Sequence, residues 1–362
     1  MNIASEHQQR IHVDALVIGG GQAGLAAAHA LKNAGVGYLV VDAGAAVGDS
    51  WRRRYDALTL FTPRSVSGLP GMPLAGDPDG YATKDEFAEY LAQYAVEGGY
   101  PLETGTRITA MRHDGGLFEA VAEGGSTYAT RAVIVATGGF QKPLVPSIST
   151  RFPPSVQQIH VSDFRNTTSV PEGPVLVVGD GASGRDAALA LSGSHRVLLA
   201  KGRPRKLFPE RILGRSTWWW AERLGLLRAS SDSLLGRRMR RVDPFPNRGN
   251  DDPALVRKGV AVKPRLVAVD GANAVFEDGS REAVKAVVWA TGYRDDLRWI
   301  DIARAFGTDG GILHQEGISP VPGLFFVGRP WQRNRASGLI AGVGDDAAFI
   351  VESLRRSLPE GA

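Results

Sequence analysis

Two glycine-rich turns constrain the fold most, because each follows a short apolar strand directly and opens a helix of small residues. They span residues 16–24 (LVIGGGQAG) and 175–184 (VLVVGDGASG), and both fit G-x-G-x-x-G. The first glycine permits a tight bend, the second lets the backbone approach a pyrophosphate, and the third lets the helix pack on the strand. The chain is therefore predicted to hold two dinucleotides. The alternative is a pair of ordinary strand–helix turns.

The residue that ends the next strand indicates which dinucleotide the first unit takes. Strand 38–41 delivers Asp42, whose carboxylate is placed to accept hydrogen bonds from ribose hydroxyls. A carboxylate there would repel a ribose 2′-phosphate, so we read the first site as an FAD site. Its expected ligands are Gly19, Gly21, Gln22, Ala23, Gly24 and Asp42.

The second unit differs at the same place. Its strand 196–200 leads into residues 201–205 (KGRPR), a basic cluster that would attract a 2′-phosphate. We therefore expect NADPH there, although a solvent-exposed basic run is the alternative. The expected ligands are Gly179, Gly181, Ser183, Gly184, Lys201, Arg203 and Arg205.

Composition narrows the function. The 362 residues suffice for two domains, and 43% hydrophobic with 22% charged residues is ordinary for a globular protein. The chain has no cysteine, which excludes disulfide bridges, cysteine nucleophiles and the redox-active pair of a disulfide reductase. The seven histidines lack metal-ligand spacing, so no metal is expected.

Features that the sequence lacks also predict the location of the protein and its binding partners. No apolar run approaches the ~20 residues that span a bilayer, and the first residues show no signal-peptide pattern, so a cytoplasmic location is expected. The net charge is +4, and the basic clusters 52–54 and 237–241 lack interleaved aromatics. We expect no nucleic acid partner, and a homodimer is left open.

Two further repeats organise the chain. Apolar strands end in Ala-Thr-Gly at residues 136–138 and 290–292, on either side of the second glycine turn. We interpret them as crossings between domains, with Thr137 and Gly138 near the cofactor; two buried strands with similar endings are the alternative. The prediction is an α/β flavoprotein with two nested Rossmann-like, three-layer dinucleotide-binding domains: residues 1–145 for FAD, 146–288 inserted for NADPH, and 289–362 completing the first.

Other segments give local predictions. Thr83 and Glu86 have the spacing of a capping box and predict a helix over residues 83–98, and residues 107–129 alternate like an antiparallel meander. A strand ending at Gly328 and a final helix over 347–358, opened by 342–346, are expected beside the flavin, with Asp345 as a contact. Ordinary closure of the sheet is the alternative.

Residues 218–220 (WWW) cannot all share one helix face, so at least one indole is expected to meet solvent, a partner or a ligand channel, with simple packing as the alternative. They lie in 203–258, a stretch rich in Arg and Pro with weak periodicity.

The motifs together resemble the flavin-containing monooxygenase family, over nearly the whole chain. Besides the glycine and Ala-Thr-Gly turns, the resemblance is carried by residues 48–55 (GDSWRRRY), 61–63 (FTP), 69–70 (LP) and 330–337 (PWQRNRAS). The last segment is similar to a compact bacterial branch, and the plant YUCCA monooxygenases are more distant relatives.

The resemblance implies that NADPH reduces FAD and that oxygen then forms a flavin C4a-hydroperoxide. This intermediate oxygenates a small organic substrate at nitrogen or sulfur, or by Baeyer–Villiger insertion. The resemblance places Trp51 and Arg52 along the flavin. We expect Arg64 and Gln332 near the reactive edge of the flavin; the alternatives are a surface loop cation for Arg64 and a residue that holds its own loop for Gln332.

Two departures from the family pattern keep other functions open. His160 and Phe164 fit the fingerprint F-x-G-x-x-x-H-x-x-x-F, but Pro154 and Val156 replace its first Phe and Gly. Phe61 stands where many relatives have an asparagine. An NADPH oxidase or quinone-type reductase, and a redox-sensing flavoprotein, are therefore the alternatives.

Overall fold

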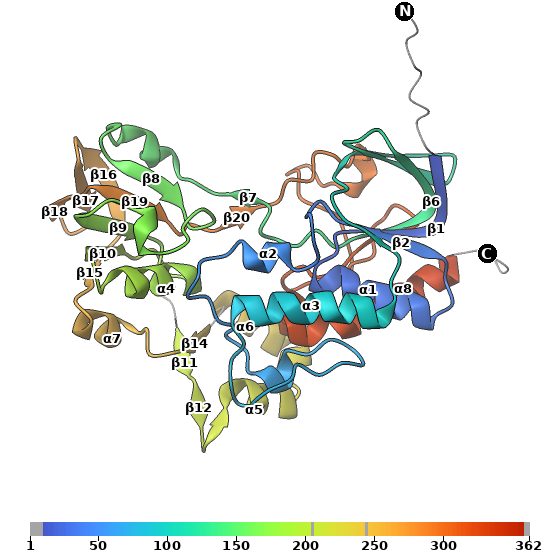
Figure 1. The fold of residues 1–362 in the computed structure, drawn as a ribbon, viewed down its shortest axis with the longest axis horizontal. Coiled ribbons are helices and arrows are strands. Elements are labelled where there is room, and N and C mark those ends of the chain that lie inside the picture. Colours follow the sequence, from blue (N-terminus) through green and yellow to red (C-terminus); the bar gives the residue numbers. More distant parts are fainter. Residues whose placement is uncertain (1–9, 204–205, 243–244, 358–362) are drawn as a thin grey trace, which may run out of the picture.

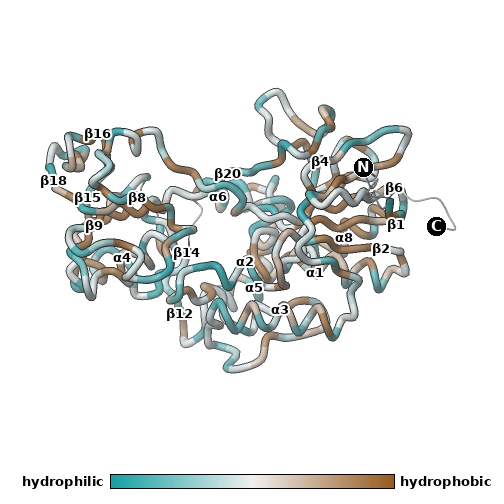
Figure 2. The backbone as a smooth tube through the Cα atoms, turned by 45° about the horizontal axis from the view of Figure 1, so that its top comes forward, coloured by the Kyte–Doolittle hydropathy of each residue, from teal (hydrophilic) through white to brown (hydrophobic). Residues whose placement is uncertain are grey.

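The structure is a computed structural model that describes residues 10–203, 206–242 and 245–357. Two separate sheets lie at opposite ends of the molecule (Figure 1). They are joined by two extended connections, which contain residues 142–143 and 293–294, and below these by residues 207–242. Apolar residues concentrate in the strands of the two sheets (Figure 2). The predicted α/β fold is confirmed.

The first sheet has the strand order β3-β2-β1-β6-β5-β4, and β21 pairs with the end of β6. Strand β1 runs parallel to β2 and β6, whereas β4, β5 and the start of β6 form the predicted antiparallel meander. The strands are β1 (Arg10–Ile18), β2 (Tyr38–Val41), β3 (Leu102–Glu103), β4 (Ile108–Asp114), β5 (Leu117–Ala122), β6 (Thr127–Val135) and β21 (Leu324–Phe326).

Both faces of this sheet are covered. Alternate residues of β1 belong to different apolar clusters, with Val17 facing one side and Leu16 the other. The helices on the side of Val17 are α1 (Gln22–Asn33), α3 (Lys84–Gly98) and α8 (Ile340–Ser357). The meander and residues 297–321 cover the other side, so the strand edge carrying the first glycine turn lies within three layers.

The second sheet is entirely parallel, in the order β15-β10-β9-β19-β8. Helices α4 and α7 pack on one face, and a three-stranded antiparallel sheet packs on the other. The elements are β8 (Gln157–His160), β9 (Pro174–Val178), α4 (Ala182–Leu191), β10 (Arg196–Ala200), α7 (Asp252–Arg257), β15 (Ala261–Lys263), β16 (Leu266–Asp270), β17 (Asn273–Phe276), β18 (Arg281–Ala283) and β19 (Ala286–Trp289).

The chain leaves the first sheet after β6, builds the second sheet, and returns to the first at β21. The two connections lie side by side, because β7 (Lys142–Pro143) pairs antiparallel with β20 (Tyr293–Arg294). Each follows one of the Ala-Thr-Gly turns. In each sheet the glycine turn lies beside an Ala-Thr-Gly turn: Gly19 is next to Ala136, and Gly179 is next to Ala290.

A strap, residues 207–242, departs from the second sheet after β10 and packs against elements of the first. Its buried Trp218 and Leu227 form an apolar cluster with Ala336 and Leu339. The elements in and beside it are β11 (Leu207–Pro209), β12 (Arg211–Ile212), β13 (Arg215–Ser216), α5 (Thr217–Arg223), α6 (Leu234–Val242) and β14 (Phe245–Asn247).

The remaining helices are short: α2 (Asp49–Arg52) and the 3-10 turns Arg64–Val66, Ser147–Arg151, Thr167–Ser169, Leu226–Arg228, Ala303–Ala305 and Arg335–Gly338. Residues 43–80 are thus largely irregular, as expected. None of the described helices has the length and apolar content needed to cross a membrane.

Two predicted helices had different outcomes. The capping box of Thr83 and Glu86 is present and starts α3 as expected. The final helix was predicted to begin at Ala347, but α8 begins at Ile340. The predicted start was too late because residues 342–346 were taken as the segment that opens the helix, whereas they lie inside it and their glycines allow close packing. A Cβ on Gly342 would lie 2.4 Å from Ala336, and one on Gly344 2.5 Å from Pro70.

Candidate dinucleotide-binding sites

The first glycine turn has one tight end and one open side. Gly19 has a φ of +109°, and a Cβ on Gly24 would lie 1.7 Å from the carbonyl oxygen of Gly19. A Cβ on Gly21, in contrast, would meet no described atom within 4 Å. Gly19 and Gly24 are therefore required by the fold itself, whereas Gly21 borders open space that a ligand can approach.

The N-terminus of α1 faces this space, and no acidic side chain of the helix itself neutralises it. Within the described residues no side chain caps the helix, and its first turn contains no acidic residue. Asp42 lies beside it: its two carboxylate oxygens accept hydrogen bonds from the amides of Gly20 and Gly44, both at 2.6 Å. Bare helix N–H groups next to a fixed carboxylate suit a phosphate with a neighbouring ribose, so the donor set fits a dinucleotide.

Several residues predicted to contact the flavin surround the turn. The indole nitrogen of Trp51 donates to the side-chain oxygen of Gln22 at 3.2 Å. A Cβ on Gly328 would lie 2.6 Å from the Cβ of Ala23, so the end of β21 approaches the start of α1 closely. Arg52 instead donates to the carbonyl of Val47 at 2.6 Å, which fixes it along its own loop.

Thr137 and Gly138 are bridged by one side chain. The amide nitrogen of Gln141 donates to the hydroxyl of Thr137 at 2.7 Å and to the carbonyl of Gly138 at 2.8 Å. Its oxygen accepts from the backbone of Asp296 at 2.6 Å. Gln141, which the sequence reading missed, therefore ties the outgoing connection to the returning one.

The second glycine turn repeats the geometry of the first. Gly179 has a φ of +106°, and its Cβ would lie 2.4 Å from the carbonyl oxygen of Ala290. A Cβ on Gly184 would lie 1.8 Å from the carbonyl oxygen of Gly179. Gly181 begins α4 with no side-chain cap from the described residues and no acidic residue in the first turn. This turn also fits a pyrophosphate.

In the basic cluster beside the second turn, Lys201 is already paired with a carboxylate of the protein. Lys201 donates to Asp252 at 2.5 Å, and the other oxygen of Asp252 accepts from Arg185 at 2.9 Å. These two contacts help hold the pKa of the half-buried Asp252 low although burial raises it. Arg203 is exposed, and Arg205 lies outside the described residues.

Two carboxylates near Lys201 escaped the sequence reading. Asp180, inside the glycine turn itself, is buried and accepts from the amide of Gly202 at 3.3 Å. Asp252 arrives from α7, some fifty positions later in the chain. Asp180 could have been recognised from the sequence because it lies inside the glycine turn, whereas Asp252 could not, because it is far from the turn in the chain.

Arg64 and Gln332, predicted near the reactive flavin edge, are both held by the protein. Arg64 donates to Glu86 at 2.6 Å and to the carbonyl of Ala75 at 2.7 Å, and it lines a cavity of about 740 Å³ under residues 64–78. Gln332 is buried and donates to the carbonyl of Phe326 at 2.8 Å. Within the described residues no hydrogen bond joins Arg64 to Gln332, and their roles stay predictions.

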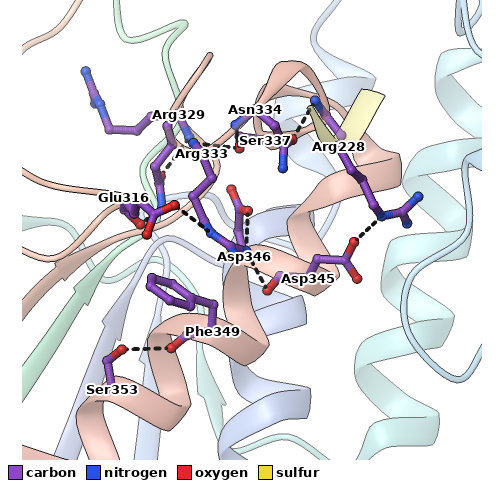
Figure 3. A network of polar contacts seen from close by, with 12 residues as sticks. Arg228, Glu316, Arg329, Arg333, Asn334, Ser337, Asp345, Asp346, Phe349 and Ser353 are labelled. Carbon is purple, nitrogen blue, oxygen red and sulfur yellow. Dashed lines mark hydrogen bonds and ion pairs between the residues drawn. The ribbon is translucent and has the colours of Figure 1, made fainter. Parts of the chain in front are cut away.

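A polar network surrounds the start of α8 (Figure 3). Asp345, expected at the flavin, accepts from Arg228 of the strap at 2.7 Å. Its neighbour Asp346 is buried and lies 3.4 Å from Arg333, which in turn lies 3.8 Å from Glu316. Burial raises the pKa of Asp346 to about 6, and within the described residues its Oδ2 atom has no hydrogen-bond partner.

Polar contacts next to the second glycine turn also join residues 43–80 to helix α4 of the second sheet. The hydroxyl of Tyr55 donates to Asp186 of α4 at 2.8 Å, and Asn250 donates to the other carboxylate oxygen at 3.1 Å. Burial raises the pKa of Asp186, and the Tyr55 bond opposes that shift. Residues 43–80 thus reach the helix whose N-terminus is the second candidate phosphate site.

His160, which fits the partial fingerprint, has contacts at both ring nitrogens. Its two ring nitrogens lie 2.9 Å from the hydroxyl of Ser162 and 3.0 Å from the carbonyl of Gly292. Burial lowers its pKa. The ring therefore joins the end of β8 to the second Ala-Thr-Gly turn.

Comparison with solved structures identifies the same fold in several flavoproteins. The flavin-containing monooxygenase from Stenotrophomonas maltophilia is 24% identical, with a TM-score of 0.81 over 96% of this chain and 99% of that one. The bacillithiol disulfide reductase Bdr (YpdA) from Staphylococcus aureus is 15% identical, with a TM-score of 0.71 over 96% and 100%. Both similarities concern the fold.

Sequence comparison identifies relatives along the whole chain. The uncharacterized oxidoreductase CzcO-like of Geobacillus kaustophilus is 41% identical over 344 residues, 94% of this chain and 98% of that protein. The indole-3-pyruvate monooxygenase YUCCA4 of Oryza sativa subsp. japonica is 27% identical over 95% of this chain and 88% of its own. The resemblance to flavin monooxygenases is thereby confirmed.

A family model, described as pyridine nucleotide-disulphide oxidoreductase, matches residues 16–206, which contain both glycine turns. This match covers more than half of the chain. The chain therefore belongs to the pyridine nucleotide-disulphide oxidoreductase family.

Proposed function

We propose that this protein is an NADPH-dependent flavin monooxygenase that oxygenates a small organic substrate at nitrogen or sulfur, or by Baeyer–Villiger insertion. The observation that carries the proposal is the pair of matched glycine turns, each with a bare helix N-terminus. One turn has a fixed carboxylate beside it and the other a lysine. Two such turns in one chain suit a hydride donor and a flavin acceptor.

The proposed FAD site is the first turn. The backbone at Gly21 and the N-terminus of α1 would hold the pyrophosphate, and Asp42 would hold the ribose. Trp51, Thr137, Gly138 and the loop after Gly328 would bound the flavin ring. Bound there, FAD would supply the redox and oxygen chemistry, whereas the chain positions it and excludes water.

The proposed NADPH site is the second turn, with Lys201 beside the 2′-phosphate and Asp252 holding the lysine in place. The nested division into residues 1–145, 146–288 and 289–362 is part of the same proposal. Within it, the strap belongs by sequence to the NADPH domain but packs against residues of the FAD domain.

The family also includes enzymes that reduce disulfides, and this chain lacks the chemistry for that route. It has no cysteine, so electrons leaving the flavin have no thiol pair to enter. Oxygen and a small organic acceptor are therefore the proposed partners, and the similarity to the indole-3-pyruvate monooxygenase YUCCA4 supports oxygenation.

The test is the fate of oxygen during NADPH turnover. With a true substrate, a monooxygenase consumes one NADPH and one O₂ for each oxygenated product and releases little hydrogen peroxide. We expect a panel of amines, thioethers and ketones to contain a compound that lowers peroxide release while NADPH oxidation continues. Peroxide equal to the NADPH consumed with every compound would contradict oxygenation.

That contrary result would favour an NADPH oxidase, which one observation supports. Phe61 occupies the place where many relatives have an asparagine, and its ring packs 5.8 Å from that of the buried Trp218. Neither ring presents an amide to the reactive flavin position. Negligible NADPH oxidation despite binding of both cofactors would instead favour the redox sensor.

A further inference from the structure

The strap carries an unusual combination of charge and exposed apolar surface. It is about a tenth of the chain, yet it contains eight arginines against three acidic residues. Of the fifteen large apolar side chains exposed in the described part of the molecule, six lie in it: Ile212, Leu213, Leu224, Leu234, Leu235 and Val242. Ile212, Leu213 and Leu224 lie in or next to the β12–β13 hairpin and α5, and the other three lie in α6. Exposed apolar groups among cations are typical of a docking site.

The apex of this surface is the β12–β13 hairpin, which projects from the body of the molecule at the lower edge of Figure 1. Leu213 at its tip is 88% exposed and has a φ of +51°. Glycine or asparagine is the usual choice for that backbone conformation, and a bulky leucine there is an outlier that points to function.

The hairpin and α5 form one unit behind this tip. The indole nitrogen of Trp220 donates to the carbonyl of Ile212 at 2.9 Å, and the rings of Trp219 and Trp220 lie edge to face with centroids 4.8 Å apart. Both indoles are only half-buried. Tryptophans placed behind an exposed leucine suit a boundary between apolar and polar surroundings.

Cations surround the same unit. Arg211 and Arg215 flank the tip, about half-exposed, and share one carboxylate, Asp79, at 4.0 and 3.8 Å. Arg223 ends α5 and is exposed, as is Leu224 next to it. Further along the strap, α6 is strongly hydrophilic (Figure 2), with exposed arginines at 237, 238, 240 and 241. Glu222 of α5 pairs with Arg228, and because the eight arginines of the strap outnumber its three acidic residues, the strap as a whole is net positive.

We propose that the strap docks on an anionic lipid surface, with the hairpin tip inserted among the acyl chains and the arginines at the phosphate headgroups. Charge complementarity selects this occupant, because arginine pairs well with phosphate. The projecting shape agrees: a fluid bilayer can enclose a protruding tip, which a flat protein partner cannot. An aliphatic tip also differs from the stacked aromatic rings that single-stranded nucleic acids require.

The test is co-sedimentation of the purified full-length protein with vesicles. We expect binding to vesicles of phosphatidylcholine mixed with phosphatidylglycerol, much weaker binding to phosphatidylcholine alone, and release by added salt. Leu213→Asn keeps a residue suited to positive φ but removes the apolar tip, and it should weaken binding roughly tenfold. Arg223→Gln should weaken binding to anionic vesicles alone.

Two matched substitutions elsewhere serve as controls. Val96→Asn removes an equally exposed aliphatic side chain from α3, and Arg355→Gln removes an exposed arginine from α8. Both should bind vesicles like the original protein. Unchanged NADPH oxidation and thermal unfolding would confirm that all four variants fold.

Three results would overturn the proposal: no vesicle binding at low salt, equal binding to both lipid compositions, or binding that the strap variants leave unchanged. Self-association that Leu213→Asn abolishes, without vesicle binding, would assign the surface to a second copy of the chain instead.

Discussion

At the residue scale, the two glycine turns separate what the fold requires from what a ligand would require. The third glycine of each turn packs against the first, and a side chain there would overlap a backbone oxygen. The second glycine of the first turn faces open space. Substitutions at these positions should therefore affect stability and cofactor binding differently.

Gly24→Ala should destabilise the protein, whereas Gly21→Ala should leave it folded. Overpacking at Gly24 is expected to lower the free energy of unfolding by about 1–3 kcal/mol or more. At Gly21 the added methyl group meets no described atom but occupies the space proposed for the pyrophosphate. Chemical unfolding and FAD titration of both variants measure this. A stable Gly21→Ala variant that binds FAD normally would refute the assignment.

Lys201 should distinguish NADPH from NADH. Lys201→Met is expected to raise KM for NADPH by roughly tenfold or more, since a hydrogen bond between charged groups contributes ~1.5–3 kcal/mol, and to change KM for NADH little. Asp252 keeps Arg185 as a partner in the variant, so the local structure should persist. The control is Lys258→Met, an exposed lysine at the end of α7. Equal effects on both nucleotides would argue against a 2′-phosphate contact.

At the element scale, the difference between α3 and α8 explains what the sequence could predict. The capping box of Thr83 and Glu86 is a local signal, and α3 follows it. At the start of α8, Gly342 packs against Ala336 in the turn before the helix, and Gly344 packs against Pro70, which is more than 250 residues away in the chain. The start of a helix was therefore predicted correctly where a capping motif marks it in the sequence. It was predicted incorrectly where packing against other segments determines it.

The contact between α8 and the preceding loop should depend on pH through Asp346. Its pKa is raised from 3.8 to about 6 by burial, so the folded state favours the protonated form. This contribution to stability is complete below pH 4 and is lost as the pH rises to about 6. Relative to Asp346→Asn, the free energy of unfolding should fall by about 1–3 kcal/mol over that interval. Urea unfolding at several pH values tests this; parallel pH profiles would contradict it.

The bond between Tyr55 and α4 should couple the two ends of the molecule. Tyr55→Phe removes a donor from the partly buried Asp186 and is expected to lower the free energy of unfolding by ~1–3 kcal/mol. Because Asp186 lies in the helix of the second turn, KM for NADPH should rise more than kcat changes. Tyr100→Phe, which removes a bond to His29 within the first unit, is the control. If both variants have the same KM, the coupling is absent.

At the scale of the whole molecule, the order of the glycine and Ala-Thr-Gly turns was enough to predict the α/β architecture. The chain path through two sheets follows that order. The position of the strap was not predictable, because its packing on Ala336 and Leu339 joins segments more than a hundred residues apart. The same applies to Asp252 and Gln141, which reach the candidate sites from outside any recognised motif.

The most direct test of the account is anaerobic reduction of the purified protein reconstituted with FAD. One FAD per chain should bind and colour the protein yellow, and NADPH should bleach the flavin absorbance much faster than NADH does. Protein that stays colourless when supplied with FAD, or a bound flavin that NADPH leaves oxidised, would contradict the central claim that the two turns hold an electron acceptor and its donor.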